Sequence, residues 1–345
     1  MKRKFLGLVL GATTCLVAAT SVMAGTLDDV KTKGFVQCGV SQGLIGFSNP
    51  DSANNWTGMD VDFCRALASA IFNDPTKVKF SPLTAKERFT ALQSGEIDVL
   101  SRNSTWTMSR DTSLGLKFAG VMYYDGQGFM VKKSLNVDSA LKLSGATVCT
   151  QTGTTTELNL ADYFKANKMD YKVVAFEKNE EVLAAYNDGR CDVYTTDQSG
   201  LYAEILKLAT PSDHVVLPEI ISKEPLGPVV RQGDDAWFNV VKWTYFALLN
   251  AEELGVSSKN VDEMMTSANP EVQRLLGVKN ADGTAAGFGT GIGLSEDWVV
   301  QIIKGTGNYG EIFERNVGES TPLKIKRGKN ALWNAGGLQY APPIR

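Results

Sequence analysis

Predicted strands and amphipathic helices alternate along the first part of this 345-residue chain, and this alternation constrains the fold more than any other feature. In the helix expected over 60–72, for example, Val61, Cys64 and Leu67 share one face at helical spacing. Strand–helix–strand units place parallel strands in one sheet, so the sequence predicts an α/β fold with largely parallel sheets. The strands are expected over 35–40, 77–80, 97–100, 146–150, 171–176 and 191–195, and the helices over 26–33, 60–72, 85–93, 155–166 and 179–188.

Residues 95–100 and 189–194 share the pattern Gly-x-x-Asp-Val. Each segment follows a predicted helix, and each leads into a short polar run, at 101–105 and at 195–199. One interpretation is that any helix–glycine–strand unit produces such a likeness. The other is a pair of related α/β lobes, each with polar residues at the carboxyl end of a strand, where open α/β sheets bind their ligands.

Two lobes imply crossings between them, and we expect these near 124–128 and near 223–228, where proline and glycine cluster. The first lobe is then predicted to comprise 25–124 and 229–345, including the C-terminal extension, and the second lobe 125–228. The return segment 236–249 is apolar on almost all sides and is therefore predicted to be buried. The glycine-rich tail beyond about residue 280 lacks the Gly-Lys-Ser/Thr of a phosphate loop, and we expect it to wrap over the first lobe.

The N-terminal segment has the pattern of a secretory signal: residues 2–4 are basic, residues 5–22 are apolar, and cleavage is expected after Ala24. Removal of 1–24 would leave 321 of the 345 residues, enough for two cores. A membrane anchor is the alternative, but glycine and threonine interrupt the run, which is shorter than the ~20 apolar residues of a span. Lipid attachment at Cys15 is a lesser alternative. The segment predicts export.

Charge and cysteine content agree with an exported protein that binds no nucleic acid. Without the signal, the chain has 32 basic and 38 acidic residues, and the basic residues form no stripe along the sequence. The remaining cysteines are Cys38, Cys64, Cys149 and Cys191, which allow three pairings. If each lobe holds its own bridge, the pairs are Cys38–Cys64 and Cys149–Cys191, each worth roughly 3 to 4 kcal/mol. With no CxxC motif and one histidine, a metal site is disfavoured.

Catalytic machinery is hard to assemble from this sequence. The single histidine, His214, lies in a predicted surface loop. Residues 39–43 match the GxSxG pattern of a hydrolase elbow, but residues 44–50 do not form the helix that this motif requires. We therefore predict no enzyme activity and no cofactor. An exported lyase or dehydratase on the same scaffold remains the alternative, as does a solute sensor without a transport role.

Three segments offer groups that suit a zwitterionic amino acid. Such a ligand needs a cation or N–H groups for its carboxylate and an acid for its ammonium, because an unpaired charge is costly to bury. Residues 105–110 place hydroxyls and Arg110 beyond the third strand. Residues 153–157 begin a helix, whose free N–H groups favour an anion, and Asp197 follows the repeated strand. Taken singly, these are a surface arginine, an ordinary helix cap and an uninformative acid.

Together these segments resemble the polar amino-acid-binding proteins of bacterial ABC importers, and among them the general L-amino-acid-binding proteins of Gram-negative bacteria. The resemblance covers nearly the whole chain and is strongest at 58–64, 88–99, 103–110, 153–155 and 189–192. It implies a periplasmic binding protein-like fold of type II, in which a two-strand hinge joins two α/β lobes. It also implies a monomer in the periplasm that closes on an L-amino acid and delivers it to the membrane permease subunits.

The resemblance further implies roles for individual residues. Arg110 corresponds to the arginine that binds the ligand carboxylate, and Thr155 to a residue whose backbone N–H contacts the same group. Thr105 corresponds to a hydroxyl that meets both carboxylate and amine. Asp197 corresponds to the acid that pairs with the ammonium, and the backbone carbonyl of Asn103 accepts from that ammonium.

Selectivity for the ligand side chain is expected to depend on residues beside this clamp. Leu44 stands where the family often has an aromatic ring, which predicts a roomier wall and broad selectivity. Lys86, Arg88 and Arg102 lie near pocket segments by the same matching. One of them could favour an acidic side chain, or all three could be solvated, and solvation is the favoured expectation.

Overall fold

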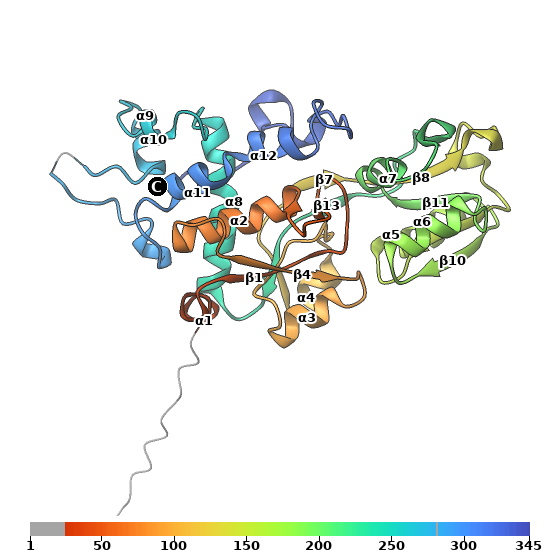
Figure 1. Cartoon of the computed structure of the whole chain (residues 1–345), viewed down its shortest axis with the longest axis horizontal. Coiled ribbons are helices and arrows are strands. Elements are labelled where there is room, and N and C mark those ends of the chain that lie inside the picture. The colour runs from red at the N-terminus through yellow and green to blue at the C-terminus, as the bar shows by residue number, and fades with distance from the viewer. Residues whose placement is uncertain (1–24, 281) are drawn as a thin grey trace, which may run out of the picture.

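The computed structural model describes residues 25–280 and 282–345, so the expected signal segment 1–24 lies outside it. Two bodies, each built on a five-stranded sheet, are joined at a narrow waist (Figure 1). At the waist, β7 (Tyr123–Asp125) pairs in antiparallel fashion with β13 (Glu224–Leu226). The predicted α/β fold of two lobes with a two-strand hinge is confirmed.

The two sheets have the same strand arrangement. Their orders are β4-β1-β5-β14-β6 and β10-β9-β11-β8-β12. In each, the first three strands are parallel, the fourth runs antiparallel to the third, and the fifth runs antiparallel to the fourth. The strands are β1 (Val36–Ser41), β4 (Val78–Leu83), β5 (Val99–Leu100), β6 (Leu116–Phe118), β8 (Gln127–Lys132), β9 (Thr147–Gln151), β10 (Lys172–Phe176), β11 (Val193–Asp197), β12 (His214–Val216) and β14 (Val229–Arg231), with the short pair β2 (Asn49–Pro50) and β3 (Trp56–Thr57) outside them.

The repeated Gly-x-x-Asp-Val segments supply equivalent strands, β5 and β11, which favours the interpretation as related lobes. Gly95 and Gly189 both have left-handed backbone conformations, with φ of 81° and 75°, which glycine adopts without strain. The prediction of largely parallel sheets is confirmed, since four strands of each sheet run in one direction; the fourth strand, β14 or β8, runs against them because it enters directly from the hinge. A chain that crosses at the hinge runs back against the strands on either side.

The helices mostly begin and end where the periodicity indicates. Those predicted over 26–33 and 155–166 have these bounds, and the helix predicted over 85–93 begins later because residues 85–87 form a turn. No described helix is long and apolar enough to cross a membrane. The helices are α1 (Thr26–Lys33), α2 (Met59–Phe72), α3 (Arg88–Ser94), α4 (Met108–Thr112), α5 (Thr155–Ala166), α6 (Asn179–Asn187), α7 (Gln198–Ile205), α8 (Asp235–Glu253), α9 (Val261–Met264), α10 (Pro270–Leu275), α11 (Trp298–Thr306) and α12 (Tyr309–Asn316).

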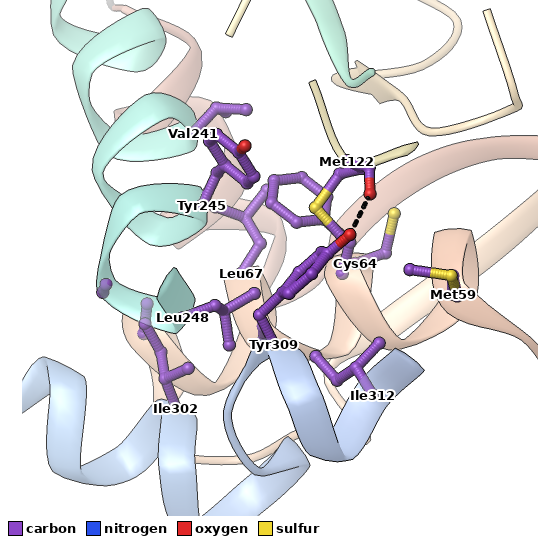
Figure 2. Close-up of a cluster of buried hydrophobic side chains, with 14 of the residues drawn as sticks. Met59, Cys64, Leu67, Met122, Val241, Tyr245, Leu248, Ile302, Tyr309 and Ile312 are labelled. Atoms are coloured by element: carbon purple, nitrogen blue, oxygen red, sulfur yellow. Dashed lines mark hydrogen bonds between the residues drawn. The ribbon is translucent and has the colours of Figure 1, made fainter. Parts of the chain in front are cut away.

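The C-terminal tail supplies part of the core of the first lobe. Side chains of α11 and α12 join those of α2 and α8 in one buried cluster (Figure 2). The Tyr309 hydroxyl donates to the Met122 carbonyl over 2.8 Å, and Arg315 pairs with Asp62 over 2.8 Å. Helix α8 is less buried than predicted, because Phe238 and other aromatic side chains on one side remain partly exposed.

His214 is buried rather than on the surface, which corrects the sequence prediction. It begins β12, is 6% exposed, and its Nδ1 lies 2.7 Å from the Tyr186 hydroxyl. Burial lowers its pKa, and the nearby Lys132 acts in the same direction. The lone histidine is therefore a structural group of the second lobe.

Each lobe holds one disulfide, as predicted. Cys38–Cys64 joins β1 to α2 and encloses a sequence separation of 26 residues, and Cys149–Cys191 joins β9 to the segment before β11 across 42 residues. Each bridge therefore restrains the unfolded chain within one lobe.

We expect loss of either bridge to destabilise its own lobe. Loop-closure entropy gives about 3.5 kcal/mol for Cys38→Ala with Cys64→Ala, and about 4 kcal/mol for Cys149→Ala with Cys191→Ala. Guanidinium unfolding, followed by circular dichroism, measures both losses. Two variants as stable as the unchanged protein would contradict a stabilising role.

Candidate ligand-binding site

The candidate site lies where the carboxyl ends of β5 and β11 face the hinge. The loop after β5 is held to β13 by backbone hydrogen bonds, from Trp106 N–H to the Pro225 carbonyl over 2.8 Å and from Gly227 N–H to the Ser104 carbonyl over 3.0 Å. The carboxyl edge of an open α/β sheet is the usual ligand position. The hinge therefore fixes the loop that carries several of the predicted ligand-binding residues.

The second lobe lies against the first around this site. The Thr105 and Thr155 hydroxyl oxygens are 3.3 Å apart, and the Lys207 ammonium donates to the Gly43 carbonyl over 2.8 Å. A Cβ atom added to Gly153 would lie 3.3 Å from the Lys86 Cα, so the backbones of the two lobes approach closely there. The two lobes therefore contact each other around the site.

Three arginines from the first lobe enter the enclosed region. Arg88, Arg102 and Arg110 are only 3%, 4% and 7% exposed. The favoured expectation of solvated side chains is therefore wrong for Arg88 and Arg102, although it holds for Lys86, whose side chain is 67% exposed. Arg88 begins α3, and a helical side chain leans toward the preceding turn, which here faces the other lobe.

The three guanidinium groups differ in how far they are already satisfied. Arg110 donates to the Thr105 carbonyl over 2.8 Å, and Arg102 donates to the Leu83 carbonyl over 3.0 Å. Arg88 and Arg110 lie 4.7 and 4.9 Å from the centre of the Phe89 ring. Within the described residues, Nε of Arg88 has no hydrogen-bond partner. Arg88 thus has the most donor capacity to spare.

Burial perturbs these cations. It lowers the pKa of Arg88 well below its ordinary value, and the neighbouring Arg102 and Arg110 act in the same direction. Burial also lowers the pKa of Arg102, to about 10, and that of Arg110. Like charges and low solvation therefore favour the arrival of an anion beside these guanidinium groups.

Three acids, Asp60, Asp197 and Glu224, act on the arginines, and Asp125 lies beside Asp197 and Glu224. Asp60 comes from α2, Asp125 and Glu224 from the hinge strands, and Asp197 from the end of β11. Asp125 accepts hydrogen bonds from the Ser199 hydroxyl and from Gly126 N–H. Burial raises the pKa of Asp197 well above its ordinary value, and Asp125 and Glu224 add to the shift while Arg88 opposes it. The arginines with Asp60, Asp197 and Glu224 form one buried charged cluster, and the half-buried Asp125 lies beside it.

Asp60 supports the loop that carries Asn103. Its carboxylate accepts from Asn103 N–H over 3.1 Å and from the Ser101 hydroxyl over 3.3 Å. Asn103 has a φ of 29°, in the left-handed region that asparagine tolerates better than most residues. The Asn103 side chain also lies near Asp197 and lowers the pKa of that acid. Asn103 is therefore close to the predicted ammonium partner.

The structure brings most of the predicted site residues together. Arg110, Thr105 and Asn103 gather on the first lobe, and Thr155 and Asp197 approach from the second. Leu44, in contrast, packs into the hydrophobic core of the first lobe, where its N–H donates to the Ser48 carbonyl over 2.7 Å. Its predicted contact with a ligand side chain stays a prediction.

Asp60, Asp125 and Glu224 were missed by the sequence analysis. Asp60 lies inside the 58–64 motif, and Glu224 lies in the segment predicted to cross the hinge. The presence of a charged residue inside each of these segments could have indicated a role at the site. No group of three or more His, Cys, Asp or Glu side chains in the described ranges is arranged to hold a metal ion.

Two sheets of equal topology, a two-strand hinge and a charged site between the lobes define a periplasmic binding protein of type II. A family model described as bacterial extracellular solute-binding proteins, family 3, matches residues 36–267, and the chain belongs to this family. It is thus a solute-binding protein rather than an enzyme, as predicted, and nothing supports the alternative of a lyase.

Several known proteins are similar to this chain over almost its full length. The general L-amino acid-binding periplasmic protein of Rhizobium johnstonii is 64% identical, over 100% of both chains. The glutamate/glutamine/aspartate/asparagine-binding protein of Rhodobacter capsulatus is 53% identical, over 100% of this chain and 99% of its own. An ABC transporter periplasmic binding protein from Brucella ovis, solved with glutathione bound, is 65% identical with a TM-score of 0.91, over 93% of this chain and 100% of its own. The resemblance to the general amino-acid group is confirmed.

The buried acids predict that stability declines with rising pH. Burial raises the pKa of Asp60 to about 7 and that of Asp125 to about 6, against ~3.9 in an unfolded chain. Their contribution is full below the unfolded pKa and is lost as pH rises through the folded pKa. We therefore expect the free energy of unfolding, measured in urea without ligand, to fall between pH 5 and pH 8.

Asp60→Asn should reduce that fall, because the variant has no carboxyl to ionise. Asp111→Asn, which changes an acid outside the buried cluster, is the control. An equally steep fall in the Asp60→Asn variant would show that this carboxyl is not responsible.

Proposed function

We propose that the protein is the periplasmic solute-binding component of an amino-acid ABC importer. It closes as a monomer on an L-amino acid and delivers it to the membrane permease subunits. The enclosed cluster of arginines and acids at the hinge carries this proposal. The names of the Rhizobium and Rhodobacter relatives, and the expected signal at 1–24, support the ligand class and the compartment.

The proposed clamp divides the two ends of the amino acid between different partners. Arg110, with a backbone N–H at the start of α5 near Thr155, binds the carboxylate. Asp197 pairs with the ammonium, aided by the backbone carbonyl of Asn103 and by the Thr105 hydroxyl. Lobes with the predicted bounds, 25–124 with 229–345 and 125–228, would separate on opening and enclose the ligand on closing.

We further propose that Arg88 binds a second anionic group of the ligand. Its Nε has no partner within the described residues, whereas Arg102 already donates to Leu83 and lies near Asp60. A second carboxylate would neutralise a buried cation at the point where three guanidinium groups repel one another. The acidic amino acids named for the Rhodobacter relative, and glutathione in the Brucella protein, carry such a group.

Arg110→Ala should abolish amino-acid binding while the fold remains intact. In a thermal-shift panel of L-amino acids, a ligand at 100 times its Kd stabilises the unchanged protein by ~2.7 kcal/mol, and this shift should vanish in the variant. Asp197→Asn should weaken amino acids far more than analogues without the amine. The control Arg190→Ala removes an exposed arginine and should keep the shift.

A panel in which no amino acid stabilises the unchanged protein would contradict the proposed function. Near-normal affinity in Arg110→Ala would contradict only the position assigned to the ligand carboxylate.

Arg88→Gln should reduce affinity for L-glutamate tenfold to a hundredfold and affinity for L-leucine less than threefold. Hydrogen bonds to charged groups contribute ~1.5–3 kcal/mol, and only glutamate makes one with this side chain. Isothermal titration calorimetry measures both values, with Lys86→Gln as the matched control, since Lys86 is an exposed cation two residues away. Equal losses for both ligands would refute the assignment.

A further inference from the structure

Glu224 is the most completely hydrogen-bonded side chain of the charged cluster. It lies on hinge strand β13 and is 1% exposed. Its Oε2 accepts from the Thr105 hydroxyl over 2.5 Å and from the Thr155 hydroxyl over 2.8 Å. Its Oε1 accepts from Asn159 Nδ2 over 2.8 Å and from the Ser222 hydroxyl over 2.6 Å. An ionised carboxylate has about four acceptor sites, so these four donors saturate it.

This carboxylate connects both lobes to the hinge. Thr105 belongs to the first lobe, in the loop that backbone hydrogen bonds hold to β13. Thr155 and Asn159 belong to the first turns of α5, in the second lobe. Glu224 therefore contacts Thr105 of the first lobe and Thr155 and Asn159 of the second lobe at the same time.

The hydrogen bonds to Glu224 fix the direction in which both hydroxyl protons point. A hydroxyl has one proton to donate and lone pairs that accept, whereas an ionised carboxylate only accepts. The protons of Thr105 and Thr155 are therefore both directed at Oε2. Toward a ligand, each hydroxyl can then only accept a hydrogen bond, through the lone pairs of its oxygen. The two oxygens lie 3.3 Å apart.

Two acceptors side by side suit an ammonium group and do not suit a carboxylate. We propose that Glu224 is a positioning residue that holds the Thr105 and Thr155 hydroxyls as acceptors for the ligand ammonium. The proposal rests on the proposed function and adds one group to it. The Thr155 hydroxyl joins the Thr105 hydroxyl at the ammonium, and the ligand carboxylate is left to Arg110 and the backbone N–H groups of α5.

Glu224→Gln tests this arrangement. Asn159 Nδ2 donates, so the carbonyl of the new amide faces Asn159 and its NH2 faces the threonines. The hydroxyl protons then turn toward the ligand and oppose its ammonium. We expect affinity for L-glutamate to fall at least tenfold, and affinity for glutarate, which lacks the ammonium, to change less than threefold. Calorimetry measures glutamate, and displacement at millimolar concentration measures glutarate.

Two further variants separate this role from a structural one. Glu219→Gln is the matched control: Glu219 accepts from the Ser139 hydroxyl and from Ala140 N–H in the second lobe, away from the site, and neither affinity should change. Thr155→Val removes one of the two acceptors and should also weaken glutamate selectively, whereas Thr155→Ser should restore it. These substitutions at the start of α5 keep the test available if Glu224→Gln does not fold.

The outcomes are distinguishable. Equal losses of glutamate and glutarate in Glu224→Gln and Thr155→Val, with normal binding by the unchanged protein, would overturn the role of Glu224 alone. Failure of the unchanged protein to bind any L-amino acid would overturn the proposed function. A crystal structure of the glutamate complex gives a direct reading. We expect both threonine oxygens within hydrogen-bond distance of the ligand nitrogen, and contact with the ligand carboxylate instead would contradict the proposal.

Discussion

The enclosure of opposite charges between two lobes is the constraint on which the rest of this structure depends. Three arginines and three of the acids, Asp60, Asp197 and Glu224, lie where solvent hardly reaches, and a buried charge is tolerated only with partners and hydrogen bonds. Neither lobe alone balances the positive and negative charges of the site, because the arginines come from the first lobe while Asp197 comes from the second. The two halves are therefore held together by a charge pattern that a zwitterion can complete.

The topology places these charges with little freedom. Each sheet presents the carboxyl end of its third strand to the hinge, and backbone hydrogen bonds between β13 and the loop after β5 hold that loop in register. Asp60 then supports the left-handed turn at Asn103. A rigid first lobe and a hinge carboxylate thus define one half of the site, and closure of the second lobe adds α5 and the end of β11.

Local patterns predicted most of the elements, because strand ends and helix starts are local features. The two disulfides followed from the expectation of two lobes, and the roles of the site residues followed from the family resemblance. Side-chain burial across the lobes was not predictable in the same way. Arg88 and Arg102 look like ordinary surface residues until the second lobe covers them. Glu224 meets Thr105 across a sequence separation of 119 residues, which no periodicity reveals. His214 is buried beside Tyr186 of another element, whose hydroxyl oxygen lies 2.7 Å from its Nδ1.

The two sheets take their strands from the chain in different ways, and this difference affects the order in which the two lobes can fold during export. All five strands of the second sheet, and the Cys149–Cys191 bridge, lie within one uninterrupted stretch from β8 to β12. The first lobe instead needs both ends of the chain, since α11 and α12 complete the core around α2 and α8. A chain that emerges from its N-terminus can finish the second lobe early. The first lobe cannot complete its core until α11 and α12 have emerged, so α2 stays uncovered until then.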